Sequence, residues 1–148
     1  MAYGGIRRDK YDATFSDLIR ERADWTCETC GLVDPDGQAR GKSRRMDNSH
    51  FVPRRHQSTR FCEINCECLC KGCHQYFTED NFGKYADWKL YCLGTEGYDA
   101  LKRKGREIKK RTKAEKEEMR NHHLACFGYI RKRREKGQIG YIEFPAWD

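Results

Sequence analysis

The apolar residues near the N-terminus recur at the spacing of a helix. Four of them would share one face of a helix over residues 10–24: Phe15, Leu18, Ile19 and Ala23. Asp12 or Thr14 could cap its start, because both side chains accept hydrogen bonds from free backbone N–H groups. This pattern predicts an N-terminal helix that delivers the chain to Trp25 and a first pair of cysteines.

The next stretch has no helical period. Residues 33–41 contain Asp-Pro-Asp-Gly and a second glycine, and we interpret them as a turn-rich loop. We expect residues 44–53 to be extended. Residues 54–64 form a basic, polar connection that ends in a few apolar side chains.

A second helical pattern begins near His74 and runs to about Tyr91, with a break expected around Thr78. Its apolar face is broad and largely aromatic: Tyr76, Phe77, Phe82, Tyr85, Trp88 and Leu90. Gly94 and Gly97 then interrupt the pattern.

The C-terminal third is rich in basic residues between 102 and 113. Thr112 and Glu115 have the spacing of a capping box, which predicts a helix from there to a stop at Gly137. Leu124, Phe127 and Ile130 would pack on the core or on a second subunit. We expect residues 139–144 to form a short closing strand.

The composition adds two constraints. Hydrophobic residues make up 37% of the 148 residues and charged residues 36%, so the core is small and a cross-link should support it. The formal net charge is +7 and the pI about 9.0, which favours a polyanionic partner such as nucleic acid. The length predicts one domain with an appendage.

The nine cysteines do not suggest a secreted disulfide framework. Their number is odd, and the first seven residues contain no apolar run that would act as a signal peptide. No apolar stretch approaches the roughly 20 residues that span a bilayer. We therefore expect an intracellular protein in a reducing compartment, with no membrane contact.

Two Cys-x-x-Cys pairs instead predict a structural zinc site. Cys27, Cys30, Cys70 and Cys73 are the expected ligands, since zinc prefers four thiolates in a tetrahedron. Cys66 or Cys68 could replace one of them, although we favour reading both as small apolar residues of a strand. We interpret Cys92 and Cys126 as ordinary buried thiols.

The second cysteine pair lies among residues that could hydrolyse a phosphodiester. That reaction needs a base to activate water and a cation to stabilise charge on the phosphate. His50, Asn65 and His74 occur in an order that resembles the HNH (ββα-metal) nuclease family. The Leu-Cys-x-x-Cys-His segment at residues 69–74 and Pro53 extend the resemblance.

The resemblance implies a role for each residue. His50 would be the general base, Asn65 would hold the loop or orient that base, and His74 would bind a divalent metal, Mg²⁺ or Mn²⁺. It also implies a small α+β fold with a zinc-stapled ββα-metal core, an N-terminal helix and a basic helical extension.

The chain departs from the family immediately before the base, where Ser49 stands in place of the usual aspartate or histidine ligand. Asp47 is the nearest carboxylate, and its spacing to His50 is similar to that of phage NinG-type recombination nucleases. We therefore expect Asp47 to be the second metal ligand, with Asn81 as an alternative.

Each of these residues has a structural alternative. His50 could be a surface or zinc-binding histidine, and His74 could replace Cys73 on the zinc. Asn65 could cap a turn. Asp47 could pair with an arginine close by in the sequence.

Two basic groups are candidate DNA contacts. The first surrounds His50 in the sequence: Arg44, Arg45, Arg54 and Arg55. The second ends the C-terminal helix: Arg131, Arg133 and Arg134. A solvated charged helix is the alternative for the second group.

Together these observations predict a nuclease domain over residues 1–95 and a basic, mainly helical extension over residues 96–148 for DNA contact or dimerisation. The expected function is a metal-dependent DNA endonuclease, acting in phage recombination or as a homing endonuclease. It would act in bacterial or phage-infected host cytoplasm, and a homodimer would suit a branched DNA substrate. The alternative is a non-catalytic zinc-stapled module that binds nucleic acid.

Overall fold

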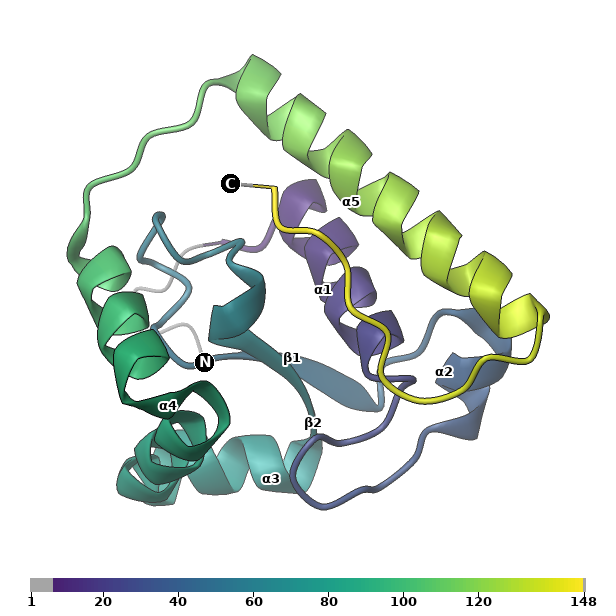
Figure 1. The fold of residues 1–148 in the computed structure, drawn as a ribbon, viewed down its shortest axis with the longest axis horizontal. Helices are drawn as coiled ribbons and strands as arrows, with labels where there is room; N and C mark the ends of the chain where they lie inside the picture. The colour runs from purple at the N-terminus through teal and green to yellow at the C-terminus, as the bar shows by residue number, and fades with distance from the viewer. Residues whose placement is uncertain (1–6, 148) are drawn as a thin grey trace.

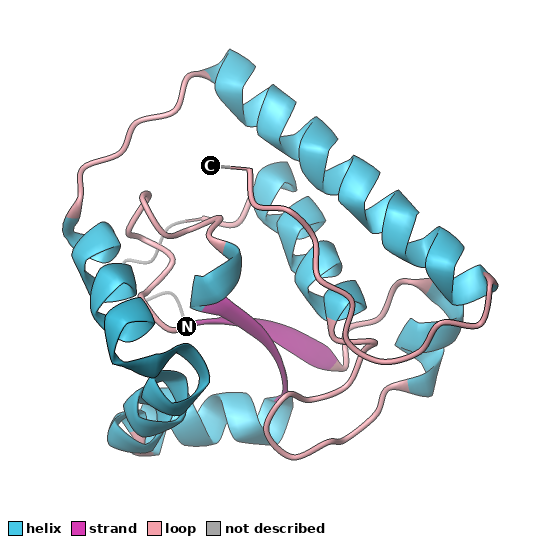
Figure 2. Cartoon of the chain, in the orientation of Figure 1, coloured by secondary structure: helices cyan, strands magenta, loops and turns pink. Residues whose placement is uncertain are grey.

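The structure is a computed structural model that describes residues 7–147, and the chain has an α+β fold (Figures 1 and 2). Residues 1–6, which entered the argument against a signal peptide, lie outside the described residues. The helices are α1 (Lys10–Arg22), α2 (Pro35–Arg40), α3 (Lys71–Gln75), α4 (Phe82–Arg106) and α5 (Lys113–Glu135). The sheet contains β1 (Met46–His50) and β2 (Cys66–Cys70), and shorter helical turns are η1 (Glu63–Asn65) and η2 (Tyr76–Asp80).

The sheet is an antiparallel pair that ends next to the candidate site. Met46 pairs with Cys70 and His50 pairs with Cys66, so His50 stands at the end of β1 where β2 begins. Side chains alternate between the two faces of a strand. Asp47 and Ser49 therefore lie on one face of β1 and His50 on the other.

Helix α1 forms as predicted but has a different cap. The Asp9 carboxylate accepts hydrogen bonds from the backbone N–H groups of Tyr11 and Asp12, and the Asp12 side chain accepts from the N–H of Asp9. Neither Asp12 nor Thr14 is the N-cap, so that prediction was wrong by one turn. The apolar face is buried as expected, with Phe15, Leu18 and Ile19 among the least exposed side chains.

The predicted loop at residues 33–41 is wrong, because α2 occupies it. The Asp34 side chain accepts a hydrogen bond from the N–H of Gly37, Pro35 is the first helical residue, and Gly41 ends the helix with φ 68°. Proline and glycine are thus the start and stop signals of a short helix rather than the corners of a turn.

The segment from β2 to Arg106 is almost continuously helical. It begins at Lys71, widens to a π-helical turn over η2, is interrupted at Asn81 rather than at Thr78, and resumes as α4. Gly94 kinks α4 with φ 72°, whereas Gly97 does not interrupt it. Residue 95, the predicted domain boundary, therefore lies inside α4, directly after the kink. No helix in the described part of the chain has the length and apolar character needed to cross a bilayer.

Helix α5 lies alongside α1, and the C-terminal segment turns back from the end of α5 and runs across α1 (Figure 1). The capping box of Thr112 and Glu115 is confirmed. Residues 139–144 form no strand, contrary to the prediction. The N–H of Ile142 donates to the carbonyl of Arg22 at 2.9 Å, and the Ile142 side chain is buried while Ile139 is exposed.

Two apolar clusters form the core. One lies between α1, α5 and the C-terminal segment and includes Phe15, Met119 and Ile130. The other lies between the sheet and α4 and includes Leu69, Tyr85 and Leu101. The sheet contributes to both clusters, with Cys66 in the first and Cys68 in the second.

Candidate functional site

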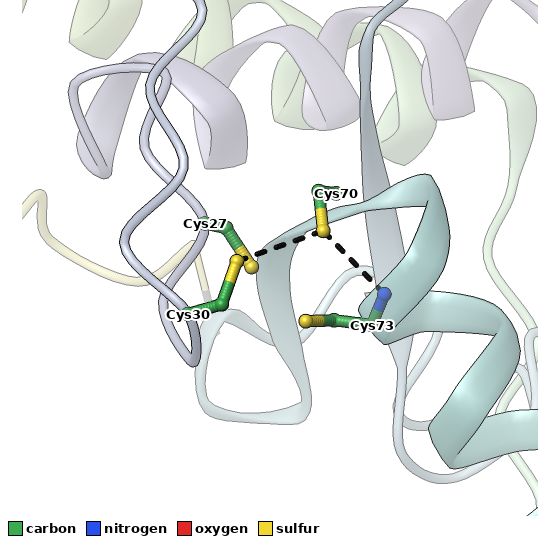
Figure 3. Close-up of side chains that lie close together, drawn as sticks. All are labelled: Cys27, Cys30, Cys70 and Cys73. Carbon is green, nitrogen blue, oxygen red and sulfur yellow. Dashed lines mark hydrogen bonds between the residues drawn. The ribbon is translucent and has the colours of Figure 1, made fainter.

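The four predicted cysteines come together in one cluster (Figure 3). Cys27 and Cys30 lie in the turn after α1, Cys70 ends β2 and Cys73 lies in α3. All four sulfur atoms lie within 4.8 Å of one another, and those of Cys30 and Cys70 are 3.7 Å apart. A tetrahedron with Zn–S bonds of about 2.3 Å has sulfurs about 3.8 Å apart. The cluster could therefore hold a structural metal ion such as zinc.

The pKa values of two thiols in this cluster are shifted in opposite directions. Burial raises the pKa of Cys27, but hydrogen bonds from the Cys30 backbone and the Thr29 hydroxyl outweigh it and lower the pKa to about 6. Burial and the neighbouring sulfurs raise the pKa of Cys73 to about 12. A bound cation would stabilise all four groups as thiolates.

The remaining cysteines lie outside the cluster. Cys66 and Cys68 are buried in β2, as the interpretation of a strand predicts. Cys126 is buried too. Cys92 is exposed on α4, so its interpretation as a buried thiol was wrong.

His50 has a defined hydrogen-bond partner at the end of β1. Its Nε2 lies 2.9 Å from the carbonyl oxygen of Arg60. Because a carbonyl only accepts, Nε2 carries the proton and Nδ1 carries the lone pair. Burial is the main reason that the pKa of His50 falls to about 4, and the positive charges of Arg54 and Arg60 lower it further. The imidazole is neutral at pH 7 and able to accept a proton at Nδ1.

Asn65 is fully buried and ties together the loop that follows His50. Its Oδ1 accepts from the N–H of Val52 at 2.7 Å, and its Nδ2 donates to the carbonyls of Val52 and Thr59. Thr59 directly precedes Arg60, whose carbonyl accepts from His50. Asn65 therefore holds the loop that follows His50 at two points, Val52 and Thr59.

Asp47 and His74 form a second polar pair. His74 Nδ1 lies 2.8 Å from Asp47 Oδ2, and Lys71 donates to the other carboxylate oxygen. Partial burial raises the pKa of Asp47, but the bonds from His74 and Lys71 outweigh it and hold the pKa below its usual value. Asp47 contacts α3 and does not pair with an arginine.

Ser49, at the position where the resemblance predicts a metal ligand, bonds to α4 instead of to Asp47 or His74. Its Oγ lies 2.7 Å from the hydroxyl of Tyr85 on α4, and Tyr85 donates to Glu67. Lys89 Nζ completes this buried network at 2.5 Å from the second Glu67 oxygen. Burial raises the pKa of Glu67 to about 7. The network joins the sheet to α4 and removes Ser49 from the set of candidate metal ligands.

His50 and His74 share the wall of one cavity of about 460 Å³. Asn48, Phe51, Arg54 and Phe82 also line it. Asp47 lies in a neighbouring hollow of about 860 Å³, and Arg8 borders both. The fold thus brings a neutral histidine and a histidine–carboxylate pair to adjoining hollows, although 24 residues separate His50 from His74 in the sequence.

The first group of predicted DNA contacts lies around these hollows. Arg44 and Arg45 are exposed and line the larger hollow together with Lys42. Arg54 lines the smaller cavity and Arg55 is exposed nearby in the sequence. These positions place positive charge on both sides of the polar pair.

The second group needs correction at two of its three positions. Arg131 and Arg134 bind the fully buried carboxylate of Glu21 at 3.1 and 3.2 Å, and both also donate to backbone carbonyls. These contacts hold α5 on α1, so both arginines have partners within the fold that the sequence did not predict. Arg133 is exposed and bonds to the hydroxyl of Tyr129 at 2.8 Å.

Sequence reasoning missed the residues that support His50. Asp12 was considered only as a helix cap, and Arg60 was given no role of its own at the site. In the structure they form a buried ion pair next to the histidine. Their separation of 48 residues carries no periodic signal that could have linked them.

Comparison with models of protein families, with curated proteins and with solved structures found no match to this chain. The geometry of the site therefore carries the functional argument. Within residues 7–147, the four cysteines are the one group of three or more Cys, His, Asp or Glu residues whose ligand atoms converge.

Proposed function

We propose that this protein is a metal-dependent DNA endonuclease of the HNH type. The observation that supports this most directly is the state of His50. Its Nε2–H is bound to a carbonyl, its Nδ1 lone pair is free to take a proton, and it shares a cavity with His74. His50 is only partly buried and lines this cavity together with His74, so it is placed to meet a ligand rather than to fill the core.

In this proposal His50 Nδ1 takes a proton from water, whose oxygen bonds to phosphorus as the P–O3′ bond breaks. The leaving oxygen takes a proton from solvent. Asp47 and His74 would hold the divalent ion, Mg²⁺ or Mn²⁺, since a carboxylate oxygen and an imidazole nitrogen suit it. When bound, such an ion stabilises negative charge on the phosphate and the leaving oxygen.

The surrounding charge fits a DNA substrate. Arg44, Arg45, Arg54 and Arg55 would bind phosphates of the backbone, which gives affinity with little base preference. The four-cysteine cluster would hold a structural zinc, because four thiolates leave no open position for catalysis. A homodimer would allow two strands of a branched substrate to be cut together.

The test is cleavage of supercoiled plasmid and of a synthetic four-way junction, with Mg²⁺ and with Mn²⁺. We expect His50→Ala to lower the cleavage rate by roughly 10²- to 10⁴-fold, the range of a lost general base, and to keep DNA affinity. His122→Ala, at a histidine of α5 that lines neither hollow, is the control and should cut normally. Preference for the junction would favour a recombination nuclease, and preference for one plasmid site would favour a homing endonuclease.

One observation favours the alternative, a non-catalytic zinc-stapled module that binds nucleic acid. Both oxygens of Asp47 are already bonded, one to Lys71 and one to His74. A wild-type protein that binds DNA but cuts neither substrate with either ion would support this module and contradict the endonuclease.

A further inference from the structure

A buried ion pair lies next to His50 and has no part in the reaction proposed above. Arg60 Nε donates to Asp12 Oδ1 at 2.8 Å and its NH2 group to Oδ2 at 2.5 Å, so the contact is bidentate. Asp12 is 3% exposed and Arg60 is 5% exposed. Asp12 also accepts from the N–H of Asp9 in the first turn of α1. The pair therefore anchors the residue 60 segment to the start of a helix.

The backbone of Arg60 is the part that contacts the site. Its carbonyl accepts the Nε2–H of His50, while its side chain is held by Asp12. The segment from Phe51 to Cys62 contains no helix or strand, so side-chain bonds must set its position. Asn65 holds the segment at Val52 and Thr59, and Asp12 holds it at Arg60.

We propose that Asp12 and Arg60 are positioning residues that fix the Arg60 carbonyl and, through it, the ring orientation and protonated nitrogen of His50. This inference deepens the proposed endonuclease and rests on it. A buried ion pair contributes little net stability compared with well-packed apolar residues. What the bidentate contact supplies is geometry, because the planar guanidinium meets the carboxylate in one orientation. Neither residue contacts the reacting atoms.

The direct test is NMR of the ¹⁵N-labelled, zinc-loaded chain. The Nε2–H proton of His50 should exchange slowly with water in the wild type, because it is enclosed and bonded to Arg60. Asp12→Asn should speed this exchange by about tenfold or more, since the carbonyl loses its anchor. Glu117→Gln is the matched control. It removes a carboxylate that binds Lys10 and Tyr11 in the same turn of α1 but does not touch Arg60.

Cleavage assays give the second readout. Asp12→Asn should lower the cleavage rate by roughly 10- to 100-fold with DNA affinity retained, because a small misplacement of the base is enough to cause such a loss. Glu117→Gln should cut like the wild type. The NMR result does not depend on activity, so it tests the positioning role even if the wild type cuts no DNA.

A second variant separates positioning from folding. Asp12→Leu with Arg60→Met replaces the buried pair by apolar side chains, which should keep the chain folded. We expect it to lose both the protected His50 proton and cleavage. A folded double variant that keeps the protected proton would overturn the proposal, as would unchanged exchange in Asp12→Asn.

Discussion

At the scale of single residues, His50 shows how a fold favours the neutral form of an imidazole. The side chain is enclosed at the end of β1, and its one strong acceptor is the uncharged carbonyl of Arg60. A neutral acceptor does not offset the desolvation of an imidazolium, and two arginines nearby add repulsion. The neutral form is therefore favoured at pH 7, where a general base must be unprotonated.

This environment predicts the titration of His50. Its ring resonances should stay constant from pH 8 to about 5.5 and move with a midpoint of about 4. In urea the same residue should titrate near 6.5, the value of an unrestrained histidine. A midpoint near 6.5 in the folded protein would contradict the enclosure described here.

The same shift links His50 to stability. Below about pH 6.5 the unfolded chain binds a proton that the native state excludes until about pH 4. The contribution of this residue to stability is therefore fully present above pH 6.5 and is lost as the pH falls through that window.

At the scale of secondary-structure elements, α2 shows why a short helix can form from residues that are common in loops. Its six residues have an aspartate cap, a proline at the first position and a glycine stop. Gly37 faces the fully buried ring of Trp25. The helix is therefore set by contact with Trp25 as well as by its caps.

We expect Gly37→Ala to destabilise the protein by about 1–3 kcal/mol, the range for overpacking a core. An added Cβ would lie 2.4 Å from two atoms of the Trp25 ring. Helix propensity alone predicts the opposite sign, a gain of about 1 kcal/mol. Gly83→Ala in α4, where an added Cβ meets nothing within 4 Å, is the control and should not destabilise. Chemical denaturation measures both, and a stabilised Gly37→Ala would refute the contact.

At the scale of the whole molecule, a few long-range ties connect the parts of a chain with a small core. The cysteine cluster joins the turn after α1 to β2 and α3. Glu21 joins α1 to α5 through Arg131 and Arg134. Each tie links segments that are far apart in the sequence and therefore fixes how they pack in the folded chain.

Loss of the metal should act on this scale. Cys70→Ser should abolish binding of one zinc per chain, because zinc needs the complete set of thiolates. Structural zinc contributes on the order of 10 kcal/mol in small zinc domains, so the unfolding temperature should fall by roughly 10 °C or more. Cys92→Ser, at an exposed cysteine outside the cluster, should change neither. Metal analysis and thermal unfolding test this, and a Cys70→Ser protein with full zinc content would contradict it.

The sequence by itself determined the features that depend on local spacing. The two Cys-x-x-Cys pairs were sufficient to predict the four-cysteine cluster. A spacing of two residues lets both sulfurs of a pair bind the same metal ion. The helical spacing of apolar residues predicted α1, and a capping box predicted the start of α5. These signals span a few residues, so the chain alone encodes them.

Only the tertiary structure decided which distant side chains meet. Arg134 and Glu21 are 113 residues apart, and their contact converts a predicted DNA-binding arginine into a structural one. Asp12 and Arg60 are likewise 48 positions apart, and their contact, which anchors the hydrogen-bond partner of His50, has no signal in the sequence. Such pairs have no period in the sequence, because they depend on how α1, α5 and the residue 60 segment pack. Packing thus decided which charges remain for a ligand and which nitrogen of His50 carries the proton.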